Sequence, residues 1–269
     1  MHYPIQVEGA DSSNTLRELH RDYNGTIAIL CKRSRPDIQV AIAFLCTRVQ
    51  EPTEEDWRKL GRVMKYLMKT KDMFLTLEAS NLKQFKCWVD SSFNVHWDSK
   101  GHTGRSGTSG KGAIISASQK QKVNAGSSTV SELIAGSDAL SDVVWSRYFL
   151  FEQGYSIEPS ILHQDNKSTI KLLSNGRRSS KRTKHVNTRF FAIHRKVKEG
   201  EIEVNYCPTT IMWADGLTKP LQGKIFEDFR NHLLNPGDSI DEGVCCENAN
   251  TKADERRECM DDKQPSGRG

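Results

Sequence analysis

The chain has few of the features that mark membrane or secreted proteins. Hydrophobic residues make up 36% of its 269 residues, below the usual share. No apolar run approaches the ~20 residues that a membrane-spanning helix requires, and residues 1–8 are too short and polar for a secretory signal. We therefore expect no membrane partner and predict an intracellular location, in the cytoplasm or nucleus.

Cysteine usage disfavours a structural zinc site. The seven cysteines are odd in number and scattered, and none forms a Cys-x-x-Cys pair. Cys46, Cys87 and Cys207 lie in apolar segments and are predicted to be buried thiols. This pattern favours a reducing compartment.

Acidic residues are absent from residues 177–198, which contain nine Lys or Arg, although the net charge of the chain is only +5. Such local asymmetry indicates a polyanionic partner. Lys184 and Arg189 could reach a backbone phosphate, and a solvated helix face remains the alternative. His185 could assist proton transfer or bind phosphate, and a structural or surface role is equally open.

The N-terminal third is predicted to be helical. No clear pattern precedes Arg33, but residues 34–37 are typical of a helix start, with Ser34 as N-cap. A second helix is predicted from Thr53, where acids occupy the first turn. Apolar residues then recur at helical spacing, so Trp57 is interpreted as core rather than as a base-stacking platform.

The remainder alternates strand and helix patterns, which favours an α/β fold with a mixed sheet. A Gly/Ser-rich connection is predicted at residues 98–112, and the sequence after Asn235 is polar and predicted to be disordered. The predicted elements are strand 85–93, a hairpin of 113–116 with 122–125, helix 129–151, strand 161–164, helix 166–173, helix 184–198, strand 202–206 and a helix starting near Met212.

Four carboxylates occupy positions from which they can converge. Asp90 ends an apolar strand, Glu132 lies in the first turn of a helix, Asp165 ends a second strand, and Asp215 follows a third. Hard divalent cations such as Mg²⁺ prefer oxygen ligands of this kind. Two such ions ~3.5–4 Å apart can clamp a phosphodiester for attack by water. The pattern therefore predicts a nuclease.

Three of these acids also have simpler structural interpretations. Asp165 could cap the following helix, Glu132 could form a capping box with Thr129, and Asp215 could belong to a turn. Asp90 has no such explanation, because an acid beside a buried strand loses hydration unless it is paired or metal-bound.

Five motifs, taken together, resemble the RNase H domain of copia-type retrotransposon polyproteins. They are Trp-Val-Asp-Ser at 88–91, Ser-Ser-Thr-Val-Ser-Glu at 127–132, Gln-Asp-Asn-Lys-Ser at 164–168, Thr-Lys-His-Val-Asn-Thr-Arg at 183–189 and Ala-Asp-Gly-Leu-Thr-Lys-Pro-Leu at 214–221. Upstream, residues 34–38 and 66–70 resemble the end of the reverse transcriptase region of the same polyproteins. The resemblance covers roughly residues 34–234.

The resemblance implies an RNase H-like fold, a five-stranded mixed sheet flanked by helices with the acids at one edge. A small helical segment from the end of the reverse transcriptase region would precede it. The implied domains are a helical remnant at 1–80, an RNase H-like domain at 84–222, and a terminal helix with a disordered polar tail at 223–269.

The resemblance also implies an endonuclease that cleaves the RNA strand of RNA–DNA hybrids with two Mg²⁺ ions, Mn²⁺ being the alternative. By motif, Asp90 would bridge both metals and Glu132 would be the helix acid. Asp165 would be the acid after the fourth strand, and Asp215 would help hold the metal that activates water.

The implied partners are an RNA–DNA hybrid and the polymerase part of the same polyprotein. Hybrids are read largely by shape and 2′-OH contacts, so little sequence specificity is expected. Ser128, Lys184, His185 and Arg189 are the candidate nucleic-acid contacts. Small residues near Glu132, namely Ser127, Ser128 and Ser131, would let a sugar-phosphate backbone approach.

The chain departs from the family pattern at three places. Residues 104–110 replace a more compact Arg-Ser-Thr-Ser-Gly, and Gly216 stands where a bulkier residue is usual and could weaken the helix that carries Asp215. The paired aspartates of a polymerase motif are missing, since the Asp-Asp at residues 261–262 lies in the polar tail. No polymerase activity is expected. Two alternatives stay open: a catalytically inactive nucleic-acid-binding relic of the same fold, and a structural partner of a separate polymerase subunit.

Overall fold

The computed structural model describes residues 12–175 and 184–236, and the described residues up to Asn235 belong to one compact unit. Its helices are α1 (Ser12–Arg33), α2 (Gln39–Cys46), α3 (Glu54–Lys69), α4 (Ser128–Glu152), α5 (Lys167–Asn175), α6 (Lys184–Lys198) and α7 (Gly223–Leu234). Short 3-10 helices occur at Pro36–Ile38 (η1), Thr209–Ile211 (η3) and Trp213–Leu217 (η4). The predicted tail after residue 236 lies outside the described residues.

A five-stranded mixed sheet forms the centre, in the order β3-β2-β1-β4-β5. The strands are β1 (Lys86–Ser92), β2 (His102–Thr108), β3 (Ile115–Lys120), β4 (Ser160–Gln164) and β5 (Ile202–Tyr206). Strands β1 to β3 pair antiparallel, whereas β4 pairs parallel with both β1 and β5. The mixed sheet flanked by helices that the sequence predicted is confirmed.

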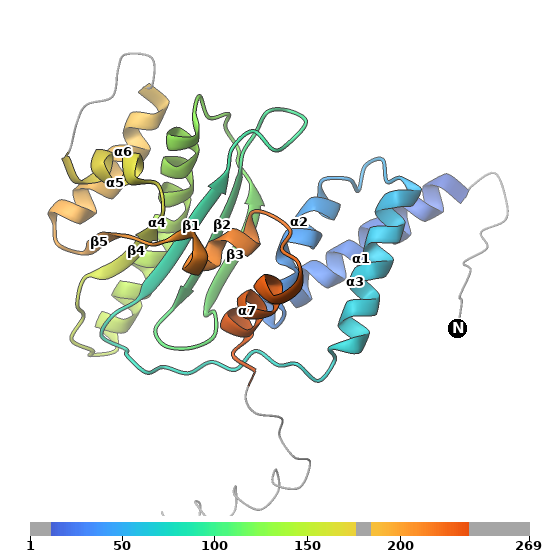
Figure 1. The fold of residues 1–269 in the computed structure, drawn as a ribbon, viewed down its shortest axis with the longest axis horizontal. Helices are drawn as coiled ribbons and strands as arrows, with labels where there is room; N and C mark the ends of the chain where they lie inside the picture. Colours follow the sequence, from blue (N-terminus) through green and yellow to red (C-terminus); the bar gives the residue numbers. More distant parts are fainter. Residues whose placement is uncertain (1–11, 176–183, 237–269) are drawn as a thin grey trace, which may run out of the picture. The chain divides into compact units, whose positions relative to one another are not determined.

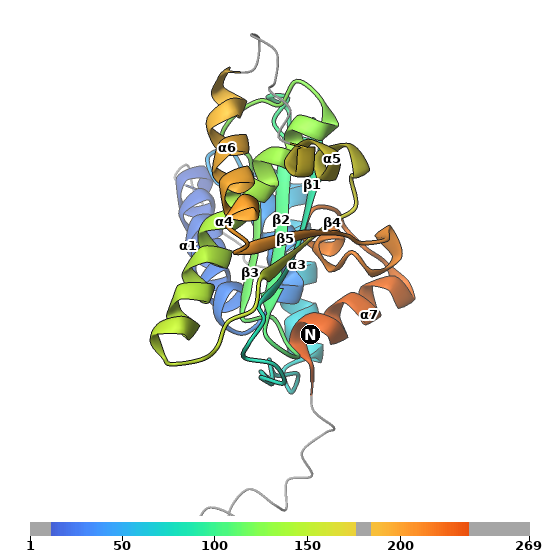
Figure 2. The ribbon, with the colours of Figure 1, turned by 90° about the vertical axis from the view of Figure 1, so that its left-hand side faces the viewer.

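Helices cover both faces of the sheet. Figure 1 shows α4, α5 and α6 on one side and α7 with the α1–α3 segment on the other, and Figure 2, after a 90° turn, shows α4 and α6 across the strands from α7. Helix α4 packs against β1, and η4 lies against β1 and β2. The division into a reverse transcriptase remnant, an RNase H-like domain and a tail stays a prediction.

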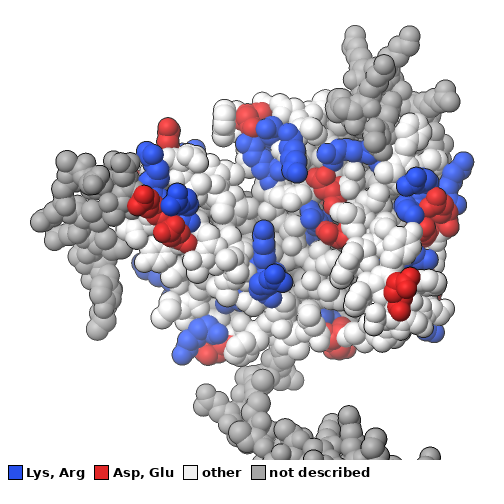
Figure 3. Space-filling view, turned by 180° about the vertical axis from the view of Figure 1, so that it is seen from behind, with Lys and Arg blue, Asp and Glu red and all other residues white. Residues whose placement is uncertain are grey.

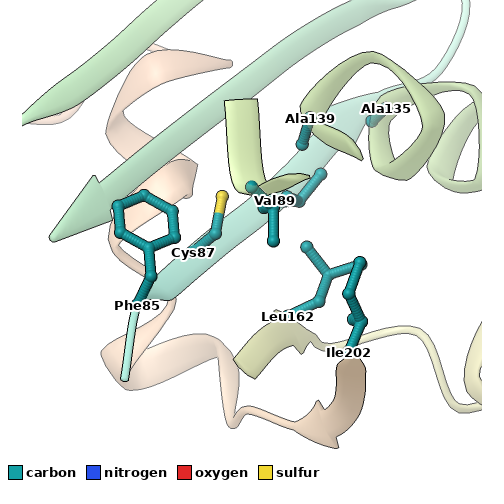
Figure 4. Close-up of a cluster of buried hydrophobic side chains, with 8 residues drawn as sticks. Phe85, Cys87, Val89, Ala135, Ala139, Leu162 and Ile202 are labelled. Atoms are coloured by element: carbon teal, nitrogen blue, oxygen red, sulfur yellow. The ribbon is translucent and has the colours of Figure 1, made fainter. Parts of the chain in front are cut away.

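Alternation along β1 decides which residues enter the core. Cys87 and Val89 point toward Ala135 and Ala139 of α4, as Figure 4 shows, and all four are buried. Successive strand side chains point to opposite faces, so Asp90 leaves this apolar layer. The small alanines let α4 lie close to the sheet. The apolar layer therefore fixes the strand that carries the first acid.

The predicted hairpin of 113–116 with 122–125 is wrong. The hairpin partners are β2, inside the predicted Gly/Ser connection, and β3. Small residues of β2 are required by close packing, since a Cβ on Gly104 would lie 2.6 Å from the Ala214 carbonyl oxygen. A buried strand built from Gly, Ser and Thr has no apolar alternation, and the sequence pattern therefore hid it.

The N-terminal helices differ from prediction at their ends. Helix α1 fills the region without a clear pattern, and Ser34 is not an N-cap, because its hydroxyl donates to the Leu30 carbonyl at the end of α1. The predicted start of α3 is confirmed by a capping box between Thr53 and Asp56. Met64 and Met68 of α3 are exposed, so only part of the predicted apolar face is buried.

A buried ion pair holds this segment together, and a partly buried hydrogen bond joins it to the sheet. Gln39 at the start of α2 donates to the Ser116 hydroxyl of β3 at 2.7 Å. Arg35 forms a buried ion pair with Asp37 at 2.9 Å. The two motifs that resemble the end of a reverse transcriptase region meet here, because Tyr66 donates to Asp37.

The structure corrects one cysteine prediction. Cys87 and Cys207 are buried as expected, whereas Cys46 at the end of α2 is exposed. Among the helices in the described ranges, none combines the length and apolar character needed to cross a membrane.

Candidate active site

Asp90 lies near the C-terminal end of β1, opposite Gly104 of β2. It is buried, with 6% of its surface exposed. The Thr218 hydroxyl donates to Asp90 Oδ2 at 2.5 Å and lies 3.1 Å from the Asp215 carbonyl oxygen. The carboxylate is therefore held on the face of the sheet that η4 covers.

Glu132 approaches from the second turn of α4. The N-cap of this helix is Ser127, whose hydroxyl accepts from the Val130 amide, so the capping box with Thr129 is not formed. Instead, the buried carboxylate accepts hydrogen bonds from the Ser91 amide and the Gln164 side chain, each at 3.2 Å. Both contacts aim Glu132 at the end of the sheet.

Asp165 follows β4 and does not cap α5. Asn166 takes that role, because its Oδ1 accepts from the Ser168 and Thr169 amides at 3.0 Å. Gln164 Oε1 accepts from the Asp165 amide at 2.8 Å and so fixes the backbone where the strand ends. The Asp165 carboxylate remains available to the site.

Asp215 lies in the 3-10 helix η4 and pairs with Lys219 at 2.8 Å. Its Oδ1 is buried without a hydrogen-bond partner among the described residues. The neighbouring Gly216 is a packing requirement, since a Cβ there would lie 2.5 Å from the Phe229 ring of α7. Glycine thus allows α7 to hold η4 in place, and a simple turn does not account for this acid.

The chain folds so that three of the acids meet. Carboxylate oxygens of Asp90, Glu132 and Asp165 lie within 4.8 Å of one another. The charge of Asp215 acts on both Asp90 and Asp165. Three of the four predicted acids therefore come together at the end of β1 and β4, and Asp215 is near enough for its charge to act on two of them, although the catalytic roles of all four stay a prediction.

Burial and mutual repulsion disfavour ionisation of these acids. Burial, with the charges of Asp90 and Asp165, raises the pKa of Glu132 to about 8. Burial raises the pKa of Asp90 to about 6, opposed by the Thr218 hydrogen bond and reinforced by Asp215 and Asp165. The pKa of Asp165 is raised for the same reasons. For all three acids burial is the larger cause and repulsion between the carboxylates the smaller one.

The donor set fits hard divalent cations. All four side chains offer carboxylate oxygens, which are the ligands that Mg²⁺ and Mn²⁺ accept. Asp215 Oδ1 is buried without a hydrogen-bond partner among the described residues, and the charge of Asp215 acts on Asp165. Lys219 supplies a positive charge from one side, and its pKa is raised, because the ion pair with Asp215 outweighs the effect of burial. One lysine leaves the cluster with a net negative charge that a metal would neutralise.

The predicted nucleic-acid contacts are placed unevenly. Ser128 is exposed in the first turn of α4, but Ser131 is buried and donates to Gln121. Arg189 is engaged by Asp138 at 2.7 Å. Lys184 lies in the first turn of α6, as does His185, and both side chains fall outside the described residues.

Figure 3 shows small mixed groups of basic and acidic side chains on one face, separated by wide uncharged areas. On that face, the part of the chain that the structure describes shows no single basic stripe. The predicted phosphate contacts of residues 177–198 therefore stay a prediction, and residues 177–183 lie outside the described residues.

Three residues that orient the acids were not singled out from the sequence. Thr218 contacts Asp90, Lys219 contacts Asp215, and Gln164 contacts Glu132. All three lie inside the motifs at 164–168 and 214–221, so the motif itself was the available signal. Their partners are separated by up to 128 residues in the chain, which a pattern cannot reveal.

Known sequences from mobile elements are similar to this chain. No family model matches the chain. The retrovirus-related Pol polyprotein from transposon TNT 1-94 of Nicotiana tabacum is 30% identical over 201 residues, which are 74% of this chain. Its counterpart from transposon RE2 of Arabidopsis thaliana is 29% identical over 216 residues, 79% of this chain. The chain is homologous to retrotransposon Pol polyproteins. It spans about 15% of the length of these two relatives.

The retrotransposon resemblance expected from the sequence is thus confirmed. Among solved structures, LC11-RNase H1 in complex with an RNA/DNA hybrid matches with a TM-score of 0.38 and 14% identity, covering 49% of this chain and 92% of that one. RNase H1 from Halobacterium salinarum matches with a TM-score of 0.36 and 14% identity, covering 50% and 93%.

Proposed function

We propose that this retrotransposon Pol homologue is an endonuclease that hydrolyses the RNA strand of RNA–DNA hybrids with two divalent metal ions. The observation that carries the proposal is the convergence of Asp90, Glu132 and Asp165 within 4.8 Å, with Asp215 beside them. Buried like charges are costly unless a cation compensates them. The cluster is therefore best explained as a metal site.

The four acids would hold the metal ions, with Mg²⁺ preferred and Mn²⁺ as the alternative. Bound ions of this kind lower the pKa of water and stabilise charge on a phosphodiester. Neighbouring residues of the chain would hold the acids in position. Thr218 orients Asp90, while the Ser91 amide and Gln164 orient Glu132. Lys219 balances part of the charge of Asp215.

Substrate contacts are proposed at the approaches to the acids. Ser128, exposed at the start of α4, would allow a sugar-phosphate backbone to come close. Lys184, His185 and Arg189 would act from α6, where Arg189 must share its charge with Asp138. The polymerase part of the same polyprotein is the proposed protein partner.

The test is cleavage of a labelled RNA–DNA hybrid by the full chain in Mg²⁺, with single-stranded RNA and duplex DNA as substrate controls. EDTA and the substitution Asp90→Asn should each abolish cleavage, because an amide cannot supply the negative charge that a bridging ligand requires. Asp228→Asn removes a half-exposed acid of α7 and should leave activity unchanged.

Binding of the hybrid without any cleavage by the wild-type chain would favour the inactive relic. Retained cleavage by Asp90→Asn would place the activity, or a contaminating nuclease, elsewhere.

A further inference from the structure

A cavity of about 600 Å³ opens between α2, α3 and the loop that joins β1 to β2. Sites of 300–1,000 Å³ are typical of small-molecule and cofactor pockets. Its apolar wall includes Phe44 of α2 and Val63 of α3, and Trp97 of the loop stands at its edge. Neither the fold nor the acid site explains why such a cavity exists.

The charged residues that line the cavity are all basic. Arg48, Lys59 and Arg62 belong to the lining, and no Asp or Glu does. Asp56 and Glu55 of α3 contact these cations from outside the lining at 3.5–4.0 Å. The cations nevertheless keep 41%, 39% and 70% of their side-chain surface exposed. The chemistry therefore suits a ligand that is both apolar and anionic.

Trp97 is the most exposed large hydrophobic residue among those the structure describes, at 86%. Its loop is ordered by hydrogen bonds from the Val95 and His96 amides to the Lys100 carbonyl oxygen. Lys120 lies 5.3 Å from the ring centroid of Trp97. An indole held in this way is available for stacking, which single-stranded nucleic-acid sites use together with nearby cations.

The cavity and the acid site share a neighbour. Thr218 lines the cavity, and its hydroxyl donates to Asp90. His102, two residues along β2 from the position opposite Asp90, lines it as well. A strand whose phosphate lay at the acids could therefore continue into the cavity.

We infer that this cavity binds an unpaired nucleotide of a nucleic-acid strand that leaves the acid site, with its base on Trp97 and Phe44 and its phosphates at Arg48, Lys59 and Arg62. The inference rests on the proposed function for the identity of the polymer, but it does not require that the acids hydrolyse it. An apolar peptide is the competing occupant, and the basic lining does not favour a cationic one.

The first test measures binding alone. The full chain is titrated against a fluorescein-labelled eight-nucleotide oligo(dT) in EDTA at low salt, with anisotropy as the readout. Trp97→Ala should weaken binding at least about fivefold, since stacking contributes about 1–3 kcal/mol per base. Trp145→Ala is the matched control, because Trp145 is also exposed but stacks on Phe149 of α4 instead of lining the cavity.

The second test addresses the phosphates. Arg62→Gln should reduce the slope of log affinity against log salt by roughly 0.7, the value for one phosphate of a single strand. Arg58→Gln, on the same helix and similarly exposed but outside the lining, should leave the slope unchanged. Equal binding by wild type and Trp97→Ala, or equal slopes for the two arginine variants, would overturn the inference.

A cleavage assay separates this inference from the proposed function. If both hold, a hybrid with a single-stranded overhang is cut faster than a blunt one, and Trp97→Ala removes only that advantage. Trp97-dependent binding of oligo(dT) without cleavage of any hybrid would reject the nuclease and keep the cavity site. Cleavage of the hybrid, with oligo(dT) binding that does not depend on Trp97, would keep the nuclease and reject the cavity site. Displacement of a fluorescent apolar probe by a peptide but not by oligo(dT) would assign the cavity to the peptide.

Discussion

The helical segment and the sheet each bury a cluster of charged side chains, and the two clusters are built in opposite ways. In the helical segment, Arg35 donates to both carboxylate oxygens of Asp37 at 3.0 and 2.9 Å. Tyr66 donates to the same carboxylate, and Arg35 also donates to the Thr70 carbonyl. This cluster is neutral, and its hydrogen bonds join the η1 segment between α1 and α2 to the end of α3.

The cluster at the end of the sheet is not neutral. It holds Asp90, Glu132, Asp165 and Asp215, against which Lys219 supplies one positive charge. The cost appears as raised pKa values for Glu132 and Asp90. Removing one partner of a buried ion pair is strongly destabilising, because it leaves the other charge uncompensated. A buried cluster of like charges is costly unless a group from outside the chain compensates it. By this comparison Asp37 is a structural carboxylate, whereas the acids at the end of the sheet fit the ligand role proposed for them.

The largest expected effect is on the neutral cluster. Asp37→Asn should lower the free energy of unfolding by about 3–5 kcal/mol, because it leaves the Arg35 charge buried without its partner. Asp22→Asn, in an exposed pair with Arg21, should change it by less than about 0.5 kcal/mol. Chemical denaturation of the three proteins gives the comparison. A loss for Asp37→Asn as small as that of the control would show that the pair is dispensable.

The second expectation concerns pH in the metal-free protein. Folded Glu132 keeps its proton up to about pH 8, while the unfolded chain releases it near its ordinary pKa of about 4.3. Unfolding therefore releases a proton between these values, and stability falls as pH rises through that window. Each pKa unit corresponds to about 1.4 kcal/mol, so the total effect reaches several kcal/mol at most.

Burial lowers the pKa of His102 and His232 to about 4. These groups act in the opposite direction below pH 6.5, so the informative quantity is the difference between wild type and Glu132→Gln in EDTA. Thermal melts from pH 5 to pH 8 should show Glu132→Gln gaining relative to wild type, and Mg²⁺ should restore wild type at pH 8. A constant difference across this range would contradict the raised pKa.

The third expectation is a change in the free energy of unfolding that has the opposite sign to the change expected for Asp37→Asn. Asp90→Asn removes one of four crowded acids, so above pH 7 it should stabilise the metal-free protein by roughly 1–2 kcal/mol while abolishing hybrid cleavage. The same chemical change at Asp37 is destabilising. A destabilised Asp90→Asn in EDTA would mean that Asp90 is held for the fold and not for a ligand.

The sequence predicted those parts of the fold in which apolar patterning is strong. Strand β1 and helix α3 were found because their buried faces alternate or recur at helical spacing. Strand β2 was missed because Gly104 and its small neighbours serve close packing against η4, which requires the absence of side-chain bulk and not apolar character. Helix α1 was missed because its apolar face is defined only by packing against α2 and α3.

The candidate site divides in the same way. Four acids could be placed from the sequence because each follows or opens a recognisable element, and the ends of neighbouring elements meet. The groups that orient them could not be placed, because the contacts of Thr218 with Asp90 and of Gln164 with Glu132 exist only after the chain has folded. Sequence patterns thus locate the candidate ligands, whereas tertiary structure locates the residues that orient them.

The smallest expected effect tests one of the residues that orient the acids. Thr218→Val keeps the shape of the side chain but removes the hydroxyl that donates to Asp90. Outer-layer hydrogen bonds to metal ligands typically contribute 10–100-fold to metal affinity or activity, and we expect about the lower limit here because Asp90 also stays fixed by β1. The Mg²⁺ concentration for half-maximal cleavage should rise about tenfold, with a smaller change at saturating metal. Thr218→Ser, which restores the donor, should return it close to the wild-type value. If valine and serine behave alike, the hydroxyl has no part in positioning Asp90, and packing of η4 against β1 alone holds the carboxylate.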